Sequence, residues 1–298
     1  MAEIDPRVNI AVNAQARIGE CVLWCDVSQS LYWTDVDAGT LHRWNPATEK
    51  RDAWCLPEKL ASFALCDEPG RLLLGLASGV ALFDTVTGEL GLTSFVEENK
   101  PTTRVNDGRC DADGRFVFGT FNLTHGGAPI GAYYRVGPDL AIERLELPEC
   151  TVANGIAFSP DGRTIYFADS PTAEIRCADY RSDGSIGPWR TFVQFAKGDG
   201  YPDGATVDAE GGIWSAHWDG ACVVRYAPNG RETDRIVLPV TRVTCVTFGG
   251  PDLSDLYVST ATIGLKEAQR LAQPNAGAIL RIPTSYRGIR ERRFSIGR

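Results

Sequence analysis

Four polar residues occupy one recurring place in this chain, and together they could bind a metal ion. Each stands 11 to 13 residues before the centre of a short apolar segment, and the four are Glu20, Asn106, Asn154 and Asp203. Two are carboxylates and two are carboxamides, so all can offer oxygen ligands. Such a set suits a hard divalent cation such as calcium, magnesium or manganese, and leaves zinc and iron(II) open. One divalent metal ion is therefore the predicted cofactor.

The apolar segments that follow these residues form a sixfold repeat. Their central residues are Tyr32, Leu73, Val117, Tyr166, Trp214 and Tyr257, which lie 41, 44, 49, 48 and 43 residues apart. A period in this range indicates a repeat architecture. The equivalent polar positions in the second and sixth units are Ser62 and Thr244.

Each unit has the pattern of a small antiparallel sheet. Turn-forming residues such as Pro160-Asp161-Gly162 precede the apolar segment, and a glycine or alanine after it opens another apolar run. Helical periodicity is weak outside residues 265–271. Units this small must bury their apolar faces against one another. We predict an all-β, six-bladed β-propeller of four-stranded antiparallel blades, forming one domain over residues 1–298.

The two ends of the chain are predicted to meet in one blade. After Thr244 there is room for only three strands, whereas residues 8–12 alternate as a strand does and precede Glu20. The N-terminal strand should therefore close the last blade. Because the first strand of each blade lines the central channel, the six equivalent positions should face one another there.

A plainer interpretation is that the polar residues only make turns. Asn-Gly and Asp-Gly steps are common in hairpins, and Asn154-Gly155 and Asp203-Gly204 are of this kind. However, each unit has a separate turn about eight residues later, and Glu20 is a poor turn former. The shared position in the repeat therefore favours a metal site.

Composition narrows the classes of partner. The formal net charge is −8 without a run of basic residues, which argues against nucleic acid and anionic membranes. The N-terminus lacks the features of a signal peptide, and no apolar stretch is long enough to span a membrane. The nine cysteines are expected to be reduced thiols. We expect a cytoplasmic protein that acts on a small molecule, as a monomer or a weak homo-oligomer.

The chain resembles the gluconolactonase family, which includes the senescence marker proteins (regucalcin) and is related to diisopropyl-fluorophosphatase. The resemblance covers nearly the whole chain. It is carried by Gly19-Glu20, Arg104-Val105-Asn106-Asp107-Gly108, Phe118-Gly119-Thr120, the run from Asn154 to Gly162, and Pro202-Asp203-Gly204.

The resemblance implies a metal-dependent lactonase. It implies one divalent metal held by Glu20, Asn154 and Asp203, with Asn106 nearby and able to bind through water. Arg104 and Asn106 match positions that contact the sugar lactone in the family, and Asp203 matches the proposed general base. The metal would polarise the lactone oxygen as a Lewis acid.

Two segments depart from the family pattern. Cys21-Val22 follows the first glutamate, where the family has glycine and proline, so the pitch of that strand could differ. The loop at residues 121–127 differs where some relatives place an acidic substrate contact. Within it, Asn122 and His125 are candidate substrate-binding residues. Asp107 should point away from Asn106 and serve as a turn residue.

The leading hypothesis is hydrolysis of an aldonolactone to the aldonic acid, with Asp203 as general base. One alternative is a phosphotriester or other ester hydrolase that uses the same metal. Another is a metal-binding propeller without catalysis, because propellers often act as scaffolds and fold alone does not establish chemistry.

Overall fold

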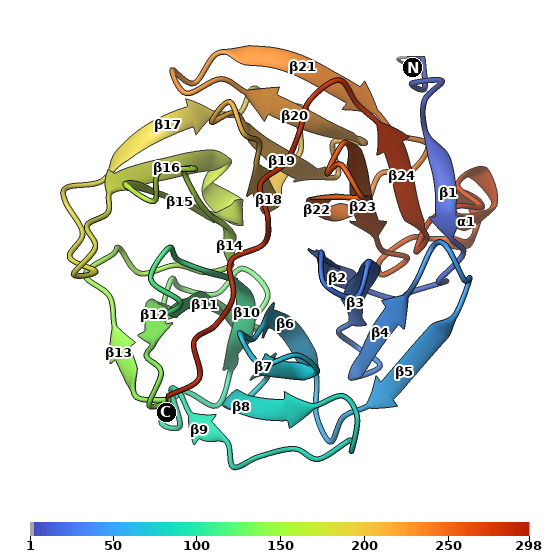
Figure 1. Cartoon of the computed structure of the whole chain (residues 1–298). Helices are drawn as coiled ribbons and strands as arrows, with labels where there is room; N and C mark the ends of the chain where they lie inside the picture. Colours follow the sequence, from blue (N-terminus) through green and yellow to red (C-terminus); the bar gives the residue numbers. More distant parts are fainter. Residues whose placement is uncertain (1–2, 298) are drawn as a thin grey trace.

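In the computed structural model, residues 3–297 form six four-stranded antiparallel sheets arranged as blades around a central axis (Figure 1). We call the region along this axis, between the innermost strands of the blades, the channel. The predicted six-bladed β-propeller is confirmed. The first blade consists of β2 (Gly19–Cys25), β3 (Ser30–Asp35), β4 (Thr40–Trp44) and β5 (Arg51–Cys55), and the second of β6 (Leu60–Leu65), β7 (Arg71–Leu76), β8 (Gly79–Asp84) and β9 (Ser94–Phe95). The third blade consists of β10 (Thr103–Cys110), β11 (Phe116–Asn122), β12 (Tyr133–Val136) and β13 (Ile142–Arg144), and the fourth of β14 (Ala153–Phe158), β15 (Thr164–Asp169), β16 (Glu174–Asp179) and β17 (Arg190–Gln194). The fifth blade consists of β18 (Tyr201–Val207), β19 (Ile213–Trp218), β20 (Cys222–Tyr226) and β21 (Glu232–Val237).

The sixth blade joins the two ends of the chain, as predicted. Its strands are β22 (Val243–Gly249), β23 (Asp255–Thr260), β24 (Ile279–Pro283) and the N-terminal β1 (Asn9–Val12), which pairs antiparallel with β24. The side chain of Val12 is 1% exposed and packs with Trp33 and Ile279. The closing strand therefore contributes to the core as well as to the sheet.

Helical structure is confined to two short segments within residues 3–297. They are the 3-10 turn η1 (Ser170–Thr172) and the helix α1 (Glu267–Ala272), which falls in the predicted amphipathic stretch. Neither is long and apolar enough to cross a membrane.

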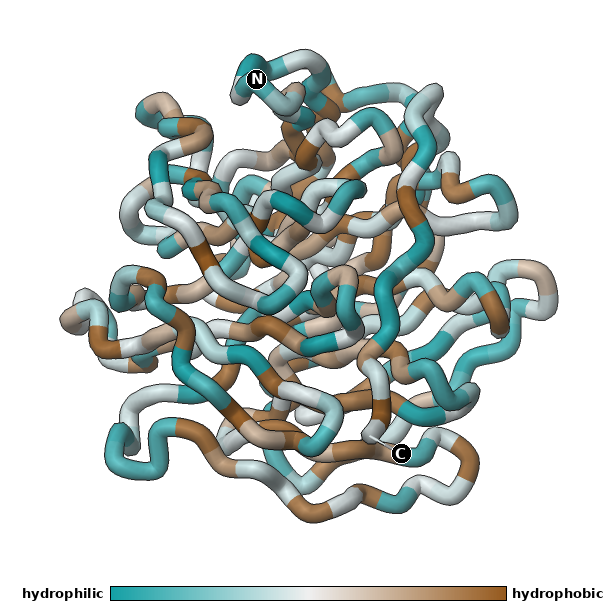
Figure 2. Tube along the Cα trace, turned by 60° about the vertical axis from the view of Figure 1, so that its left-hand side comes forward, coloured by the Kyte–Doolittle hydropathy of each residue, from teal (hydrophilic) through white to brown (hydrophobic). Residues whose placement is uncertain are grey.

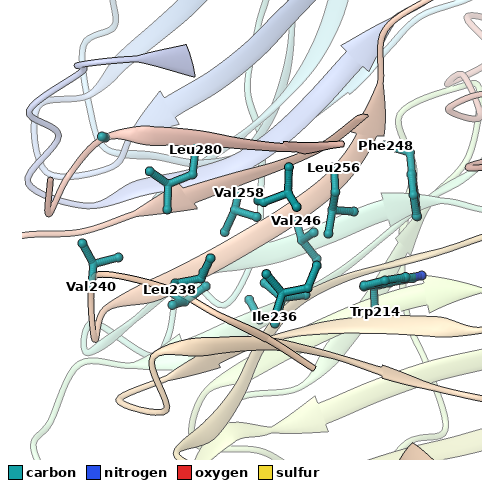
Figure 3. Close-up of a cluster of buried hydrophobic side chains, with 14 residues drawn as sticks. Trp214, Ile236, Leu238, Val240, Val246, Phe248, Leu256, Val258 and Leu280 are labelled. Carbon is teal, nitrogen blue, oxygen red and sulfur yellow. The ribbon is translucent and has the colours of Figure 1, made fainter. Parts of the chain in front are cut away.

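The core lies mainly between adjacent blades. Figure 3 shows one such layer, in which Trp214 and Ile236 of the fifth blade face Val246 and Leu256 of the sixth. Trp24 of the first blade stacks on Tyr257 of the sixth, with ring centroids 5.9 Å apart. Along the chain, hydrophobic and hydrophilic residues alternate in short stretches (Figure 2). This alternation is what a sheet needs to pack against its neighbours and keep polar turns outside.

The innermost strand of every blade carries a β-bulge near its N-terminal end. In each case one extra residue on the inner strand interrupts its pairing with the second strand of the blade. The bulges lie between Glu20 and Leu23, Leu60 and Ser62, Val105 and Gly108, Asn154 and Ala157, Pro202 and Ala205, and Val243 and Cys245. A bulge re-aims side chains and frees backbone groups from the ladder. The six predicted polar positions all lie at these bulges.

The end of the chain crosses the ring as a strap, which we define as residues 284–297 (Figure 1). The Phe294 N–H donates to the Leu65 carbonyl at 2.8 Å, and the Ser295 N–H donates to the Gly114 carbonyl at 2.9 Å. Both acceptors lie at or beyond the C-terminal ends of inner strands, whereas Glu20 and Asn154 lie near the beginnings of theirs. The strap therefore crosses the end of the channel opposite the polar bulge residues.

Candidate metal centre

Four bulges present the predicted polar residues to the channel. Asn154 and Asp203 are buried, with 6% and 5% of their surface exposed, while Glu20 and Asn106 keep partial exposure. The bulges of the fourth and fifth blades lie against each other, because a β-carbon on Gly155 would stand 3.3 Å from the Asp203 carbonyl oxygen. Gly155 also has φ +62°, a conformation that favours glycine. The Asn154-Gly155 step thus allows this close approach.

Asn106 links the third and fourth blades directly. Its Nδ2 donates to the Asn154 Oδ1 at 2.9 Å and to the Ala153 carbonyl at 2.8 Å. Its Oδ1 accepts a hydrogen bond from Arg104 Nη1 at 2.7 Å. The Asn106 amide is therefore held from both sides, and it turns the Asn154 oxygen toward the third blade.

Ser170 continues this network into the fifth blade. The Asn154 Nδ2 donates to Ser170 Oγ at 2.9 Å, and Ser170 Oγ donates to the Pro202 carbonyl at 2.7 Å. Pro202 directly precedes Asp203. The network thus runs through three blades, includes Arg104, Asn106 and Asn154, and ends at the residue before Asp203.

Arg104 is an inward residue and not a surface arginine. It is 8% exposed, its Nη1 also donates to the Val105 carbonyl at 2.7 Å, and its guanidinium lies 4.8 Å from the ring centre of Phe121. Burial lowers the pKa of Arg104 to about 10, an effect that the charges of Glu20, Asp37 and Asp203 oppose. Arg104 therefore remains charged beside the two carboxylates.

The two predicted carboxylates repel each other inside the channel. Desolvation, followed by the charge of Asp107, raises the pKa of Glu20 to about 8. Desolvation, followed by the charges of Glu20 and Asp107, raises the pKa of Asp203 well above its ordinary value. Both carboxylates would be stabilised in their charged form by a cation placed between them.

Asp107 also lies in the channel, so its predicted role as an outward turn residue is wrong. It belongs to β10, and its charge acts on both Glu20 and Asp203. Strand alternation would place it opposite Asn106, but the bulge between Val105 and Gly108 resets the alternation. A signal was available in Gly108, because a glycine within a strand often marks a bulge.

The charges in the channel favour a divalent cation. The channel contains four carboxylates and two guanidinium groups. The carboxylates belong to Glu20, Asp107, Asp203 and Glu291, and the guanidinium groups to Arg104 and Arg109. With all groups ionised, two negative charges remain. Within residues 3–297 no three histidine, cysteine or carboxylate side chains gather closely enough to hold a metal by themselves. A metal here would also need the oxygen of Asn154, which is the mixed set of carboxylate and amide oxygens that hard divalent cations accept.

The remaining predicted residues have other surroundings. Asn122 is 3% exposed, donates to the Ala128 carbonyl at 2.9 Å, and accepts the Thr124 N–H at 3.1 Å, so it orders its own loop. His125 is exposed in that loop. At the equivalent bulge positions, Thr244 donates to the Gly19 carbonyl and joins the sixth blade to the first. The buried Ser62 hydroxyl has no hydrogen-bond partner within residues 3–297.

The Cys21 departure leaves Glu20 in the ring. Cys21 adopts φ +46° at the first bulge, and its Sγ accepts the Phe63 N–H at 3.3 Å, which joins the first and second blades. Burial raises its pKa well above that of an exposed thiol. Cys21 is thus a structural residue. The nine cysteines are free thiols, as predicted, and all but Cys55 are buried.

Comparison with known proteins gives consistent matches over this fold. The model of the SMP-30/Gluconolactonase/LRE-like region matches residues 18–262. An L-arabinolactonase of Azospirillum brasilense is 41% identical over 300 residues, covering 99% of this chain and 98% of the relative. A 6-deoxy-6-sulfogluconolactonase of Pseudomonas putida is 36% identical, covering 98% and 100% of the two chains. The crystal structure of a calcium-binding protein, regucalcin, from Agrobacterium tumefaciens superposes with a TM-score of 0.91 at 28% identity and covers 96% of each chain.

Proposed function

The chain belongs to the SMP-30/gluconolactonase/LRE-like family, and on this premise we propose that it is a sugar lactonase that hydrolyses an aldonolactone to its aldonic acid with the help of one divalent metal ion. The observation that supports the proposal is that Glu20, Asn154 and Asp203 lie at bulges of the inner strands, where Asn106 and Ser170 hold Asn154 and the charges of Glu20 and Asp203 act on each other. The lactonase names of the two relatives support the reaction class.

Glu20, Asn154 and Asp203 would hold the metal, and Asn106 would bind beside it or through water. The excess of negative charge in the channel and the raised pKa values of Glu20 and Asp203 support this set. When bound, the ion would act as a Lewis acid toward the lactone carbonyl. Calcium is a reasonable first ion because the structural relative is named as calcium-binding, and zinc, manganese and iron(II) are the other candidates.

The protein groups supply binding and proton transfer. Arg104 and Asn106 would orient the lactone. Arg104 lies beside the carboxylates and has N–H donors besides those on the Nη1 that bonds Val105 and Asn106, and Asn106 holds the guanidinium in place through its Oδ1. Asp203 would take a proton from the attacking water as the new C–O bond forms. The ring C–O bond then breaks, and the proton passes to the ring oxygen, which becomes a hydroxyl group. With a cation bound beside it, Asp203 would be held in its charged form, which is the form that can accept a proton.

We propose a pentonolactone as the substrate class, with L-arabinolactone to be tested first. The argument is the 41% identity to an L-arabinolactonase over nearly the full length of both chains. Asn122 and His125 remain proposed substrate contacts from the loop at the channel mouth. A cytoplasmic location fits the proposed role in sugar breakdown.

Proton release in a weakly buffered indicator solution tests the proposal. Chelated protein, and protein refilled with calcium, manganese, zinc or iron(II), would be assayed on a panel of pentono- and hexonolactones. We expect metal-dependent opening of at least one lactone well above its spontaneous rate. Asp203→Asn should lose that activity by about 10²–10⁴-fold, whereas Ser62→Ala, at an equivalent bulge, should retain it.

Two results would contradict the proposal. If no metal accelerates any lactone, the metal-dependent phosphotriester or ester hydrolase and the non-catalytic metal-binding propeller become the better hypotheses. If Asp203→Asn turns over as fast as the unmodified chain, the lactonase assignment could stand but this residue is not the base.

A further inference from the structure

We propose that Asp107 is a positioning residue, which fixes the bulge that presents Asn154 by accepting a backbone hydrogen bond from the neighbouring blade. The structural part of the proposal stands by itself, while its consequence for metal binding rests on the proposed function. Neither the metal ligands nor the substrate contacts proposed above include Asp107.

The hydrogen bond joins two bulges. Asp107 Oδ2, in the bulge of β10, accepts the Ile156 N–H of β14 at 2.8 Å. Ile156 lies inside the bulge between Asn154 and Ala157, so its N–H is free of the sheet ladder. Ile156 is also fully buried. Without Asp107 this N–H would be a buried donor with no partner, which is unfavourable.

Asn106 and Asp107 together hold β14 from both sides of Asn154. Asn106 donates to the Ala153 carbonyl and to the Asn154 side chain, while Asp107 accepts from Ile156. The segment from Ala153 to Ile156 in the fourth blade is therefore hydrogen-bonded to the third blade at three of its residues. Gly155, with φ +62°, is the flexible link between these ties. The geometry fixes the direction of the Asn154 side chain before any ligand binds.

Arg109 supports Asp107 from the other end of the channel. Its Nη2 donates to the Ala205 carbonyl at 2.7 Å and its Nη1 to Glu291 at 2.7 Å, so it spans from the third blade to the fifth and to the strap. Its positive charge acts on Asp107. Arg109 thus partly offsets the charge of Asp107, which adds to the repulsion at Glu20 and Asp203.

The positioning role predicts a specific pattern among variants. Asp107→Ala removes the acceptor, whereas Asp107→Asn keeps a carbonyl oxygen that can accept the same N–H but removes the charge. Loss of a residue that orients a metal ligand commonly weakens metal affinity by about 10–100-fold. We expect that loss for Asp107→Ala and recovery to within about threefold for Asp107→Asn. A matched control is Asp161→Ala, which removes a carboxylate that accepts the Arg163 N–H at 3.0 Å beyond the far end of β14.

Amide hydrogen exchange at Ile156 in metal-free protein tests the structural part directly. Asp107→Ala should speed exchange there by tenfold or more, while Asp107→Asn and Asp161→Ala should leave it near the level of the unmodified chain. Unchanged exchange in Asp107→Ala would overturn the proposal, whether or not the protein proves to be a lactonase.

Calcium and manganese titrations followed by calorimetry test the consequence for metal binding. If Asp107→Asn binds metal tenfold or more weakly than the unmodified chain although Ile156 stays protected, Asp107 acts through charge and the positioning role is wrong. This comparison uses Asp107→Asn against the unmodified chain, so it decides the question even if Asp107→Ala fails to fold. Absence of metal binding by the unmodified chain would refute the proposed function, and the exchange experiment would still judge the hydrogen bond.

Discussion

Arg109 Nη1 donates a 2.7 Å hydrogen bond to Glu291 Oε2, which joins the inner strand of the third blade to the C-terminal strap. The two side chains are only 9% and 11% exposed. Because the strap crosses the end of the channel opposite the polar bulge residues, this ion pair lies at the far end of the channel from Glu20 and Asn154. The strap is therefore part of the structure that holds the channel charges in place.

Removing Glu291 should destabilise the fold. In Glu291→Ala the Arg109 guanidinium would remain buried without its carboxylate, and breaking a buried ion pair typically costs about 3–5 kcal/mol. Urea unfolding should show a loss of about 3 kcal/mol. Glu210→Ala is the matched control, because Glu210 pairs with Arg225 at 3.1 Å but is 71% exposed. Equal losses in the two variants would show that burial of the Arg109 pair is unimportant.

The fold was predictable because a propeller repeats its signals. A period of 41 to 49 residues, a turn before each apolar core and a missing strand in the last unit together indicated six blades closed by the N-terminus. The strap could not be predicted in this way. Its contacts with Leu65, Gly114 and Arg109 depend on segments far away in the chain, and its sequence has no periodicity.

The positions of the candidate site residues in the repeat were predictable, but their contacts were not. The register of the repeat identified Glu20, Asn106, Asn154 and Asp203, since equivalent positions of a propeller face the same channel. It could not show that Asn106 binds the Asn154 oxygen or that Ser170 completes the network. Asp107 was misassigned because strict alternation fails at a bulge, where one added residue changes the direction of the next side chain.

The metal-free protein should lose stability as pH rises. The pKa of Glu20 in the folded state is raised from 4.5 to about 8, so its contribution is fully present below about pH 4.5 and is lost as pH rises through 8. The loss should amount to a few kcal/mol, on the order of one per pKa unit. Melting of chelated protein between pH 5 and 9 measures it. Glu20→Gln should flatten this slope and raise the melting temperature at pH 9. An unchanged slope would mean that burial and the charge of Asp107 do not oppose ionisation of Glu20.

Acid should destabilise the protein through a different residue, His217. This side chain is fully buried, stacks on Phe195 at 4.1 Å and bonds the Asp199 carbonyl through Nδ1 at 2.8 Å. Burial lowers its pKa from 6.5 to about 4. Its contribution is therefore present above pH 6.5 and is lost as pH falls toward 4, by roughly 3 kcal/mol at most. Urea unfolding across this range should show that the free energy of unfolding falls more steeply in the unmodified chain than in His217→Gln. A ring pKa above 5, measured by nuclear magnetic resonance, would contradict the assignment.

The N-terminal strand should be needed for a stable ring. Deleting residues 1–12 removes β1, leaves the edge of β24 unpaired and exposes the pocket of Val12. Burial of a valine side chain alone contributes about 1.5–3 kcal/mol, so the free energy of unfolding should fall by about 2 kcal/mol or more. Deleting only residues 1–4, which end at the exposed Ile4, is the control. Equal melting temperatures for the two deletions would argue against closure of the sixth blade by β1.

Arg104 should act chiefly in binding the lactone. Its Nη1 holds both the Val105 carbonyl and Asn106 Oδ1, and Phe121 covers the guanidinium at 4.8 Å. Arg104→Lys keeps the charge but loses the planar group that makes both bonds. Loss of one charge-assisted hydrogen bond is worth about 1.5–3 kcal/mol, so KM should rise by about tenfold or more, with a smaller change in kcat.

Steady-state kinetics on the lactone found in the proton-release assay separates these effects. Arg176→Lys is a suitable control. Arg176 belongs to β16, its guanidinium lies 4.8 Å from the ring centre of Trp189, and it takes no part in the hydrogen-bond network of Arg104, Asn106 and Asn154. Its KM should match that of the unmodified chain. A fall in kcat with KM unchanged would assign Arg104 to the transition state instead of to ground-state binding, since only interactions made in the transition state lower kcat alone when they are removed.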